Sequence, residues 1–391
     1  MFGFTLQSKC IYTISPRVSI HHKRIVSILL IGMLMCTFCF ATMASAMTRA
    51  DTFIYTANQI GNDISAFSVD QKGSLHPVPG SPFKVGNMPV SIATSPDGRF
   101  IYNVNQGSGS ISGFRINADN GALTPLPGSP YSITFSHPDA ISVSPDGRFT
   151  YIIGEDENNV MAGRINTENG VLSFTEAQVS RTGHHPIMVA IAPNNHFAYV
   201  ANFNDNTVSQ FRVDPSNGHL IPGATYPTDE HPIHIVISAD SRFAYVANYG
   251  STTVSAFQIN PDDGTLAELP GSPYFAGAQP YSVTIDPEQN YLYSANWGSH
   301  DVSAYRMDRA TGTLTELTEF RFKSGWYPYD IVVSPDDRHV YVANNGESTI
   351  SAFDMRQQGE LKMVAQPIES DLGPYGMTII NPHLARSTFH R

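Results

Sequence analysis

Short runs of β-forming residues alternate with turn-forming residues along most of the chain. Between residues 280 and 322, the runs YSVTID, YLYSAN, DVSAYRM and LTELTEFRF are separated by PEQN, WGSH and DRATGT. Each run has the length of a strand, and each gap carries turn-forming residues such as Pro, Gly or Asn. In other copies the second run is apolar almost throughout, as in FAYVA, which favours a strand covered on both faces. The unit therefore predicts four antiparallel strands.

The same unit recurs seven times. Tyrosines separated by 47, 49, 48, 46, 48 and 48 residues mark its second run: Tyr55, Tyr102, Tyr151, Tyr199, Tyr245, Tyr293 and Tyr341. A Gly-x-Leu motif keeps the same phase, beginning at Gly73, Gly121, Gly170, Gly218, Gly264, Gly312 and Gly359. A proline opens the first run, at Pro89, Pro138, Pro186, Pro232, Pro280, Pro328 and Pro374. Seven four-stranded units predict an all-β, seven-bladed β-propeller.

Alternative repeat folds fit less well, and the two ends of the chain explain how the ring closes. A β-solenoid would use shorter repeats with caps, and a WD-type propeller has a shorter period and a Trp-Asp marker that this chain lacks. The sequence FIYTA at 53–57 is a second run, whereas YGMTII at 375–380 is a first run. The closing blade is therefore predicted to take its innermost strand from the C-terminal end and three strands from the N-terminal end, which removes two exposed edges. The propeller is assigned to residues 47–382, and 383–391 to a C-terminal tail beyond it.

The first 46 residues resemble an export signal. The basic sequence HHKR at 21–24 precedes an apolar run over 25–40 and the sequence ATMASA at 41–46, which predicts cleavage after Ala46 and a periplasmic or secreted protein. A retained membrane anchor is the alternative. All three cysteines fall in this segment, so thiol and disulfide chemistry is not expected in the mature chain. The 391-residue chain has a net charge of −11, and residues 47–391 carry 19 basic and 34 acidic side chains, which argues against nucleic acid as a partner.

The turns sort the candidate residues onto two faces, because antiparallel strands reverse direction at each turn. The SPDGR turns at 95–99 and 144–148 use Pro and Gly for their backbone angles, and they are interpreted as scaffold. The opposite face carries the inter-blade loops and the histidines His137, His184, His185, His231, His234 and His300. The scaffold face carries His196, His219, His339 and His383. Any functional pocket is therefore predicted at the channel mouth on the former face, with hydroxyls from Ser91, Ser142 and Ser282.

Other residues of that face allow more than one interpretation. Trp297, Trp326, Tyr327 and Tyr375 could rim a sugar site or plug the channel mouth. The acidic sequence at 155–157 replaces the usual Asn-x-Gly-Ser, and it is either a solvated turn or a ligand set. EHPIH at 230–234 has a metal-ligand spacing, but it lies on a loop and strand with few other ligands near it, so neither a metal nor another cofactor is predicted.

The repeat resembles the lactonase family of seven-bladed propellers. The resemblance rests on YVAN followed by G-S-x-x-V-S-A-F, G-x-L and L-P-G-S-P, and it covers residues 53–382. That family includes bacterial 6-phosphogluconolactonase and fungal carboxymuconate cyclase, and the chain is also similar to exported YVTN-type propellers. The resemblance implies a His-x-His pair and a D-L-G-x-D loop. His231 matches the first histidine, His234 lies one residue late, and NYGST at 248–252 lacks both aspartates; His185 matches in register, but Ile187 does not.

Two classes of function follow. The first is a lactone-active enzyme that hydrolyses or isomerises a sugar or muconate-type lactone, unphosphorylated or carboxylated. Its candidate catalytic residues are His231, His234, His185 and the cation Arg181. Its candidate substrate-binding residues are His184, Trp297, His300, Lys323, Trp326 and Tyr327. The second class is a non-catalytic propeller that binds a sugar, a peptide or a protein. The protein is expected to be a monomer in either case.

Overall fold

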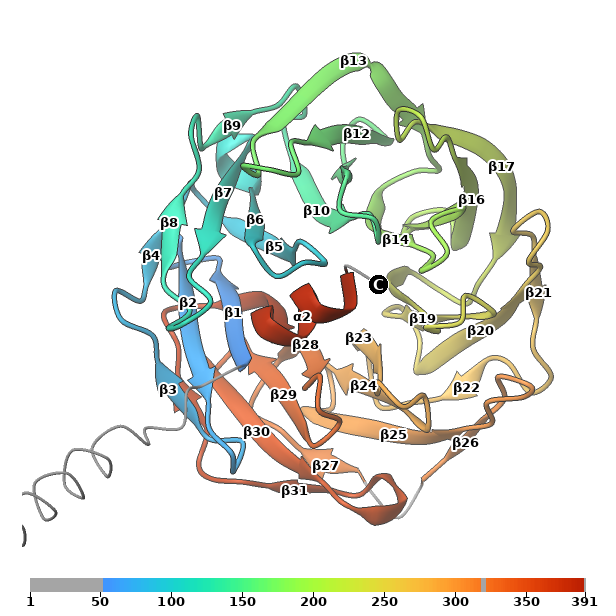
Figure 1. Ribbon diagram of the computed structural model, residues 1–391. Coiled ribbons are helices and arrows are strands. Elements are labelled where there is room, and N and C mark those ends of the chain that lie inside the picture. Colours follow the sequence, from blue (N-terminus) through green and yellow to red (C-terminus); the bar gives the residue numbers. More distant parts are fainter. Residues whose placement is uncertain (1–51, 318–320, 390–391) are drawn as a thin grey trace, which may run out of the picture. The chain divides into compact units, whose positions relative to one another are not determined.

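Residues 52–317 and 321–389 are described by a computed structural model, and they form a ring of seven antiparallel sheets (Figure 1). Each sheet is one blade, and the blades are numbered here by the order of their innermost strands along the chain. The predicted seven-bladed, all-β propeller is therefore confirmed. The predicted export signal, residues 1–46, lies outside the described residues.

Four strand positions recur in each blade. The innermost strands begin at the inter-blade prolines: β5 (Pro89–Thr94), β10 (Pro138–Val143), β14 (Pro186–Ile191), β18 (Pro232–Ile237), β23 (Pro280–Ile285), β28 (Pro328–Val333) and β33 (Pro374–Ile380). The second strands carry the tyrosine markers: β6 (Phe100–Asn105), β11 (Phe149–Gly154), β15 (Phe197–Asn202), β19 (Phe243–Asn248), β24 (Tyr291–Asn296), β29 (His339–Asn344) and β1 (Thr52–Asn58). The third strands are β7 (Ser110–Ile116), β12 (Asn159–Ile165), β16 (Thr207–Val213), β20 (Thr253–Ile259), β25 (Asp301–Met307), β30 (Thr349–Met355) and β2 (Asp63–Val69).

The outer edge differs from the single fourth strand that the sequence predicts. The outer strands are β8 (Leu123–Pro125), β13 (Leu172–Arg181), β17 (Leu220–Pro227), β21 (Leu266–Glu268), β26 (Leu314–Glu316), β31 (Leu361–Met363) and β3 (Leu75–Pro77). In five blades a second short strand also pairs with the third strand: β9 (Tyr131–Ser132), β22 (Tyr274–Phe275), β27 (Phe322–Lys323), β32 (Ile368–Glu369) and β4 (Phe83–Lys84). Pro-Gly-Ser-Pro stands between the two pieces in blades 1, 4 and 7, preceded by Leu in blades 1 and 4 and by Val in blade 7, and prolines cannot donate to a sheet ladder.

Blade 7 closes the ring as the sequence predicts. Its strand order is β3-β2-β1-β33, so the C-terminal strand β33 lies innermost, beside three strands from the N-terminal side. Tyr55 pairs with Thr378 in the antiparallel register of β1 and β33. The buried core lies between blades: each of seven apolar clusters joins residues of two neighbouring sheets. Second strands such as β19 are buried along their whole length because neighbouring blades cover both faces.

The tyrosine and the Gly-x-Leu glycine that mark the repeat form hydrogen bonds between neighbouring blades. The Tyr245 hydroxyl donates to the carbonyl of Gly312 in the next blade at 2.7 Å, and the same bond closes the ring from Tyr341 to Gly73 at 3.1 Å. Gly312 has a φ of +74°, and a Cβ there would lie 2.3 Å from the Phe243 ring. Only glycine meets both requirements, which explains why Gly-x-Leu keeps phase with the tyrosine.

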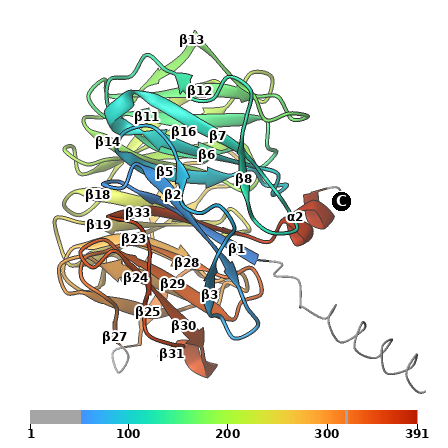
Figure 2. The same cartoon turned by 90° about the vertical axis from the view of Figure 1, so that its left-hand side faces the viewer.

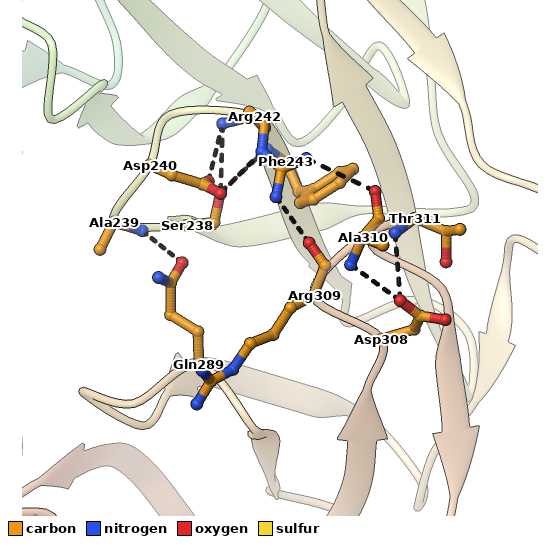
Figure 3. A network of polar contacts seen from close by, with 10 residues as sticks. All are labelled: Ser238, Ala239, Asp240, Arg242, Phe243, Gln289, Asp308, Arg309, Ala310 and Thr311. Carbon is orange, nitrogen blue, oxygen red and sulfur yellow. Dashed lines mark hydrogen bonds and ion pairs between the residues drawn. The ribbon is translucent and has the colours of Figure 1, made fainter.

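The SPDGR-type turns form a second inter-blade network (Figure 3). In blade 4, Asp240 accepts a hydrogen bond from the Ser238 hydroxyl at 2.7 Å and pairs with the Arg242 guanidinium at 2.7 Å. Arg242 then donates to the Arg309 carbonyl of blade 5 at 2.6 Å and lies over the Phe243 ring. Arg148 and Arg338 reach carbonyls of their next blades in the same way. These contacts agree with the interpretation of the turns as scaffold.

The chain after β33 does not simply continue as a tail. Helix α2 (Pro382–Phe389) follows it and lies over the centre of the ring, on the face of the SPDGR turns (Figures 1 and 2). The Asn381 side chain accepts hydrogen bonds from the first amides of the helix, His383 and Leu384, at 3.1 and 3.0 Å. His383 Nε2 lies 3.0 Å from the Ala118 carbonyl, which attaches the helix to blade 1. Within residues 52–317 and 321–389, no helix is long and apolar enough to cross a membrane.

Candidate functional site at the channel mouth

Seven side chains, one from each blade, surround the central channel where the innermost strands begin. Each follows an inter-blade proline directly: Val90, Asp139, Ile187, Ile233, Tyr281, Tyr329 and Tyr375. All seven line a cavity of about 250 Å³. The repeat therefore brings seven equivalent positions together around the cavity. The residue type at each position can vary between blades, because strand pairing uses only backbone groups.

Three tyrosines fill one side of this cavity. The ring centroids of Tyr281 and Tyr329 are 4.3 Å apart, and those of Tyr329 and Tyr375 are 4.4 Å apart. The hydroxyls of Tyr281 and Tyr375 are hydrogen bonded to each other. Burial raises the pKa of both phenols well above the ordinary value, so these groups stay neutral donors and acceptors.

A buried carboxyl faces the tyrosines from blade 2. Burial raises the pKa of Asp139 to about 8, and the charge of Glu155 adds to the rise. The Gln106 amide links these two acids, with Nε2 lying 3.1 Å from Asp139 Oδ1 and 3.3 Å from Glu155 Oε2. Glu155 Oε1 in turn lies 2.8 Å from His185 Nε2. A hydrogen-bonded path therefore leads from the cavity to His185.

His185 and His231 lie on the two sides of one aromatic ring. The Phe203 centroid is 5.5 Å from that of His185 and 4.3 Å from that of His231, with which it is nearly parallel. Both histidines have positive φ, at +55° and +52°. Met88, Gln279 and Tyr327 adopt the same conformation before their prolines, so it belongs to the inter-blade loop and not to catalysis.

One residue further along the innermost strands lie three polar groups that join neighbouring blades. His234 Nδ1 accepts a long hydrogen bond of 3.4 Å from the Val283 amide, and burial lowers its pKa to about 4, so its ring is neutral at neutral pH. Asp330 accepts bonds from the Ser282 hydroxyl at 2.8 Å and the Met377 amide at 2.7 Å. Burial raises the pKa of Asp330 to about 6, although these donors lower it.

The two cations expected near the site lie elsewhere. Arg181 ends β13, the outermost strand of blade 2, and is exposed. Three strand spacings separate β13 from β10, or about 14 Å. Lys323 is exposed on β27, where it pairs with Asp301. The prediction placed both on the correct face but could not give their distance from the channel axis. No lysine or arginine occurs among the described residues that line the cavity.

The predicted binding residues fall into two groups. His184 is exposed, with Nδ1 2.8 Å from Asp205, and it is not among the described residues that line the cavity. The other four are neighbours: Trp297 stacks on Tyr327 at 4.5 Å, and His300 lies 4.8 Å from Tyr327 and 6.3 Å from Trp326.

The acidic sequence at 155–157 divides into three roles. Glu155 faces His185, Asp156 pairs with the exposed His137, and Glu157 accepts hydrogen bonds from the Ser136 amide and hydroxyl at 2.9 and 2.8 Å. In blade 1 the corresponding acceptor is Ser108, so Glu157 has a scaffold role. The described part of the chain contains no group of three His, Cys, Asp or Glu residues arranged for a metal, including the EHPIH segment.

Four cavity residues were missed by the candidate list: Asp139, Tyr281, Tyr329 and Asp330. The sequence does contain a signal for these residues. At the first and second positions after the inter-blade proline, some copies have an apolar residue and others have an acidic or aromatic one. Aligning the seven copies at their prolines would have placed these residues on one ring.

A seven-bladed propeller with a polar and aromatic channel mouth defines the general class of the protein. The chain belongs to the family described as Lactonase, 7-bladed beta-propeller, which matches residues 41–134, 126–233 and 220–327. This agrees with the resemblance noted in the sequence. A comparison with curated proteins finds no match.

Solved structures share the fold. A candidate 6-phosphogluconolactonase of Bacteroides fragilis has 20% sequence identity and a TM-score of 0.75, covering 86% of this chain and 99% of that one. The periplasmic gluconolactonase PpgL of Pseudomonas aeruginosa has 21% identity and a TM-score of 0.72, covering 84% of this chain and 98% of that one. At these identities the likeness concerns the fold alone.

Proposed function

We propose that the protein is an exported lactone hydrolase that acts on an uncharged sugar lactone at the channel mouth. The observation that carries the proposal is the path from Asp139 through Gln106 and Glu155 to His185, which links acid–base groups to the small cavity at the channel mouth. Membership of the lactonase family supports the reaction class. A fold alone does not define a reaction, so the argument depends on this group of residues.

The carboxylate–imidazole pair fits the role of a general base. When Nε2–H of His185 donates to Glu155, Nδ1 is the ring nitrogen that can take a proton from water. The water oxygen then attacks the lactone carbonyl, the ring C–O bond breaks, and a hydroxy acid forms. Asp139 is mostly protonated at neutral pH because its pKa is about 8, so it can supply a proton to the leaving oxygen.

The charge of the cavity favours an uncharged substrate. Its described lining includes Asp139 and Asp330 but no cation that could bind a phosphate or carboxylate. Neutral tyrosine hydroxyls and the neutral His234 ring match the hydroxyls of a sugar. Of the lactones considered from the sequence, an unphosphorylated sugar lactone is therefore preferred over a carboxylated one.

The test is a hydrolysis screen on sugar and muconate-type lactones, with and without phosphate or carboxylate groups. Wild type is expected to hydrolyse a neutral sugar lactone, and His185→Ala to lower kcat/KM by about 10²–10⁴. His196→Ala, on the opposite face, is the matched control and should retain full activity. The double change His231→Ala, His234→Ala tests the two residues that the sequence favoured. Absence of turnover above buffer, or full activity of His185→Ala, would contradict the proposal.

A non-catalytic binding propeller is the second candidate. It is favoured by the engagement of His231 with Phe203 and of His234 with Val283, since both contacts suit structural roles. It predicts saturable binding of sugars by the wild type without hydrolysis of any lactone in the screen.

Export is part of the proposal, and it rests on the sequence of residues 1–46. N-terminal sequencing of the protein recovered from the periplasm or medium should begin at Met47. A membrane-bound form that retains Met1 would instead support the anchor.

A further inference from the structure

The loop that follows each second strand differs around the ring in an ordered way. Its first residue is, in blade order from blade 7, Gln59, Gln106, Glu155, Phe203, Tyr249, Trp297 and Asn345. Three consecutive blades thus carry aromatic side chains at a position where the other four carry amides or an acid. Trp326 and Tyr327, from the loop before β28, extend the row. We call Phe203, Tyr249, Trp297, Tyr327 and Trp326 the aromatic crescent.

The crescent is continuous with the cavity. The Tyr249 centroid is 5.8 Å from that of the cavity residue Tyr281, 6.2 Å from Phe203 and 6.0 Å from Trp297. Trp297 then stacks on Tyr327 at 4.5 Å. Exposure increases outwards: Tyr249 and Trp297 are half-buried, Tyr327 is 37% exposed and Trp326 is 60% exposed. A large exposed indole at the outer end of a row of aromatic rings is the pattern of a binding surface.

The size of the cavity limits what it can hold. At about 250 Å³ it lies below the roughly 300–1,000 Å³ of pockets that enclose drug-sized ligands. One sugar ring is therefore the natural occupant, and any longer ligand must continue over the surface outside it. The crescent is the apolar path that begins at the cavity wall, through the contact between Tyr249 and Tyr281.

We propose that the crescent binds the further units of an oligosaccharide whose terminal unit occupies the cavity. If the hydrolase proposal holds, on which this naming of the substrate rests, that terminal unit is the lactone. The C–H face of a pyranose ring is apolar and packs on an aromatic face, while hydroxyls at the ring edge reach polar groups such as Tyr327 Oη. The aromatic rings lie in a row rather than around a central point, so they form a platform for successive sugars and not a cage for a quaternary ammonium ion.

Trp297 and Trp326 are the two tryptophans of the chain, so tryptophan emission, excited selectively over tyrosine, reports on this surface alone. The experiment titrates the purified protein with glucose-based oligosaccharides of one to five units, in β-1,4 and α-1,4 linkage. Affinity is expected to rise about tenfold or more from one unit to three, with a shift in emission, because each stacked ring adds contact with an aromatic side chain. Trp326→Ala should abolish that gain, whereas Trp326→Tyr should retain most of it.

A melting curve of Trp326→Ala controls for folding, and the exposed position of this side chain predicts no change. Affinity that does not depend on chain length, or binding of tetramethylammonium in place of sugars, would overturn the proposal. If monomeric lactones are hydrolysed but affinity does not increase with oligosaccharide length, the hydrolase proposal holds and the binding role of the aromatic crescent is refuted. If affinity increases with length but no lactone is hydrolysed, the binding role holds and the hydrolase proposal is refuted.

Discussion

The two faces of the ring are built from the same seven repeats, but they differ in how much the residues vary between repeats. On the turn face, Tyr245 and five of its six equivalents bond the glycine of the next blade, and Arg242 and its three equivalents bond a carbonyl there. On the mouth face, the residue after the inter-blade proline is an aspartate in blade 2, isoleucine in blades 3 and 4, and tyrosine in blades 5, 6 and 7. Uniform positions hold the blades together, and varied positions surround the cavity. In a repeat protein, variation within the repeat therefore separates the binding surface from the scaffold.

The largest effect is expected at the mouth, from Glu155→Gln. Gln106 donates to one oxygen of Glu155, so the new amide should turn its oxygen towards Gln106 and its NH2 group towards His185 Nε2. This arrangement disfavours the Nε2–H tautomer, so kcat/KM should fall by about 10²-fold or more. Because Glu155 acts through His185, the pH profile of kcat/KM should also shift. Urea unfolding should change by less than about 0.5 kcal/mol, since no scaffold bond is lost. If the variant loses stability but keeps its activity, Glu155 stabilises the fold and does not position His185 for catalysis.

On the turn face, Gly312→Ala is expected to destabilise the fold by about 2–4 kcal/mol. The new Cβ would lie 2.3 Å from the Phe243 ring, and alanine disfavours a φ of +74°. Chemical denaturation measures the loss. Gly250→Ala is a comparison from the mouth face, where φ is not in the left-handed region. Equal losses at the two glycines would show that close packing does not distinguish the faces.

A matched pair of tyrosines tests the inter-blade hydrogen bond alone. Tyr245→Phe removes the bond to the Gly312 carbonyl and should cost about 0.5–1.5 kcal/mol. Tyr151 occupies the same position in blade 2, but its buried hydroxyl has no hydrogen-bond partner among the residues that the structure describes, so Tyr151→Phe should be neutral or slightly stabilising. If the two variants have equal unfolding free energies, the inter-blade hydrogen bond does not explain why the repeat has a tyrosine at this position.

The smallest predicted effect concerns an exception on the turn face, where Asp286 of blade 5 meets Asp337 of blade 6. Burial, together with the charge of Asp286 and then Glu288, raises the pKa of Asp337 to about 7. Burial also raises the pKa of Asp286, although the nearby Arg309 lowers it. The folded protein therefore binds more protons than the unfolded chain between about pH 4 and 7. Stability should fall as pH rises through this range.

Asp337→Asn removes this conflict. Asn195, at the same turn position in blade 3, donates its amide to Asp146 of the preceding blade at 2.9 Å, and the new amide can do the same to Asp286. We expect a gain of about 0.5–1.5 kcal/mol at pH 8 that diminishes towards pH 4. Thermal melts over this pH range measure it, and a gain that does not vary with pH would contradict the shared-proton explanation.

The fold could be predicted from the sequence because its markers are the inter-blade contacts themselves. Tyr341 and Gly73 bond across the closure of the ring, and the register of Tyr55 with Thr378 follows from the two incomplete copies. The site could be predicted only in part. Antiparallel strands give the face of each residue, and they put both His185 and Arg181 on the mouth face. They do not give the distance from the channel axis, and Arg181 lies on the outermost strand of its blade. Asp139 and Asp330 were missed because they meet the other cavity groups only when the ring closes.

The pairing of β1 with β33 also sets a time for folding. The hydroxyl of Thr56 bonds the carbonyl of Gly376, a contact between residues 320 positions apart. The entropy of closing so long a loop grows only with the logarithm of its length, so the thermodynamic penalty is modest. The delay is not modest: at about 5–20 residues per second, roughly 15–65 s separate the synthesis of the two strands. Until β33 has been made, β1 has an unpaired edge that can pair with another chain, and the ring cannot close. The propeller therefore stays incomplete during synthesis until β33, the strand that closes blade 7, has been made.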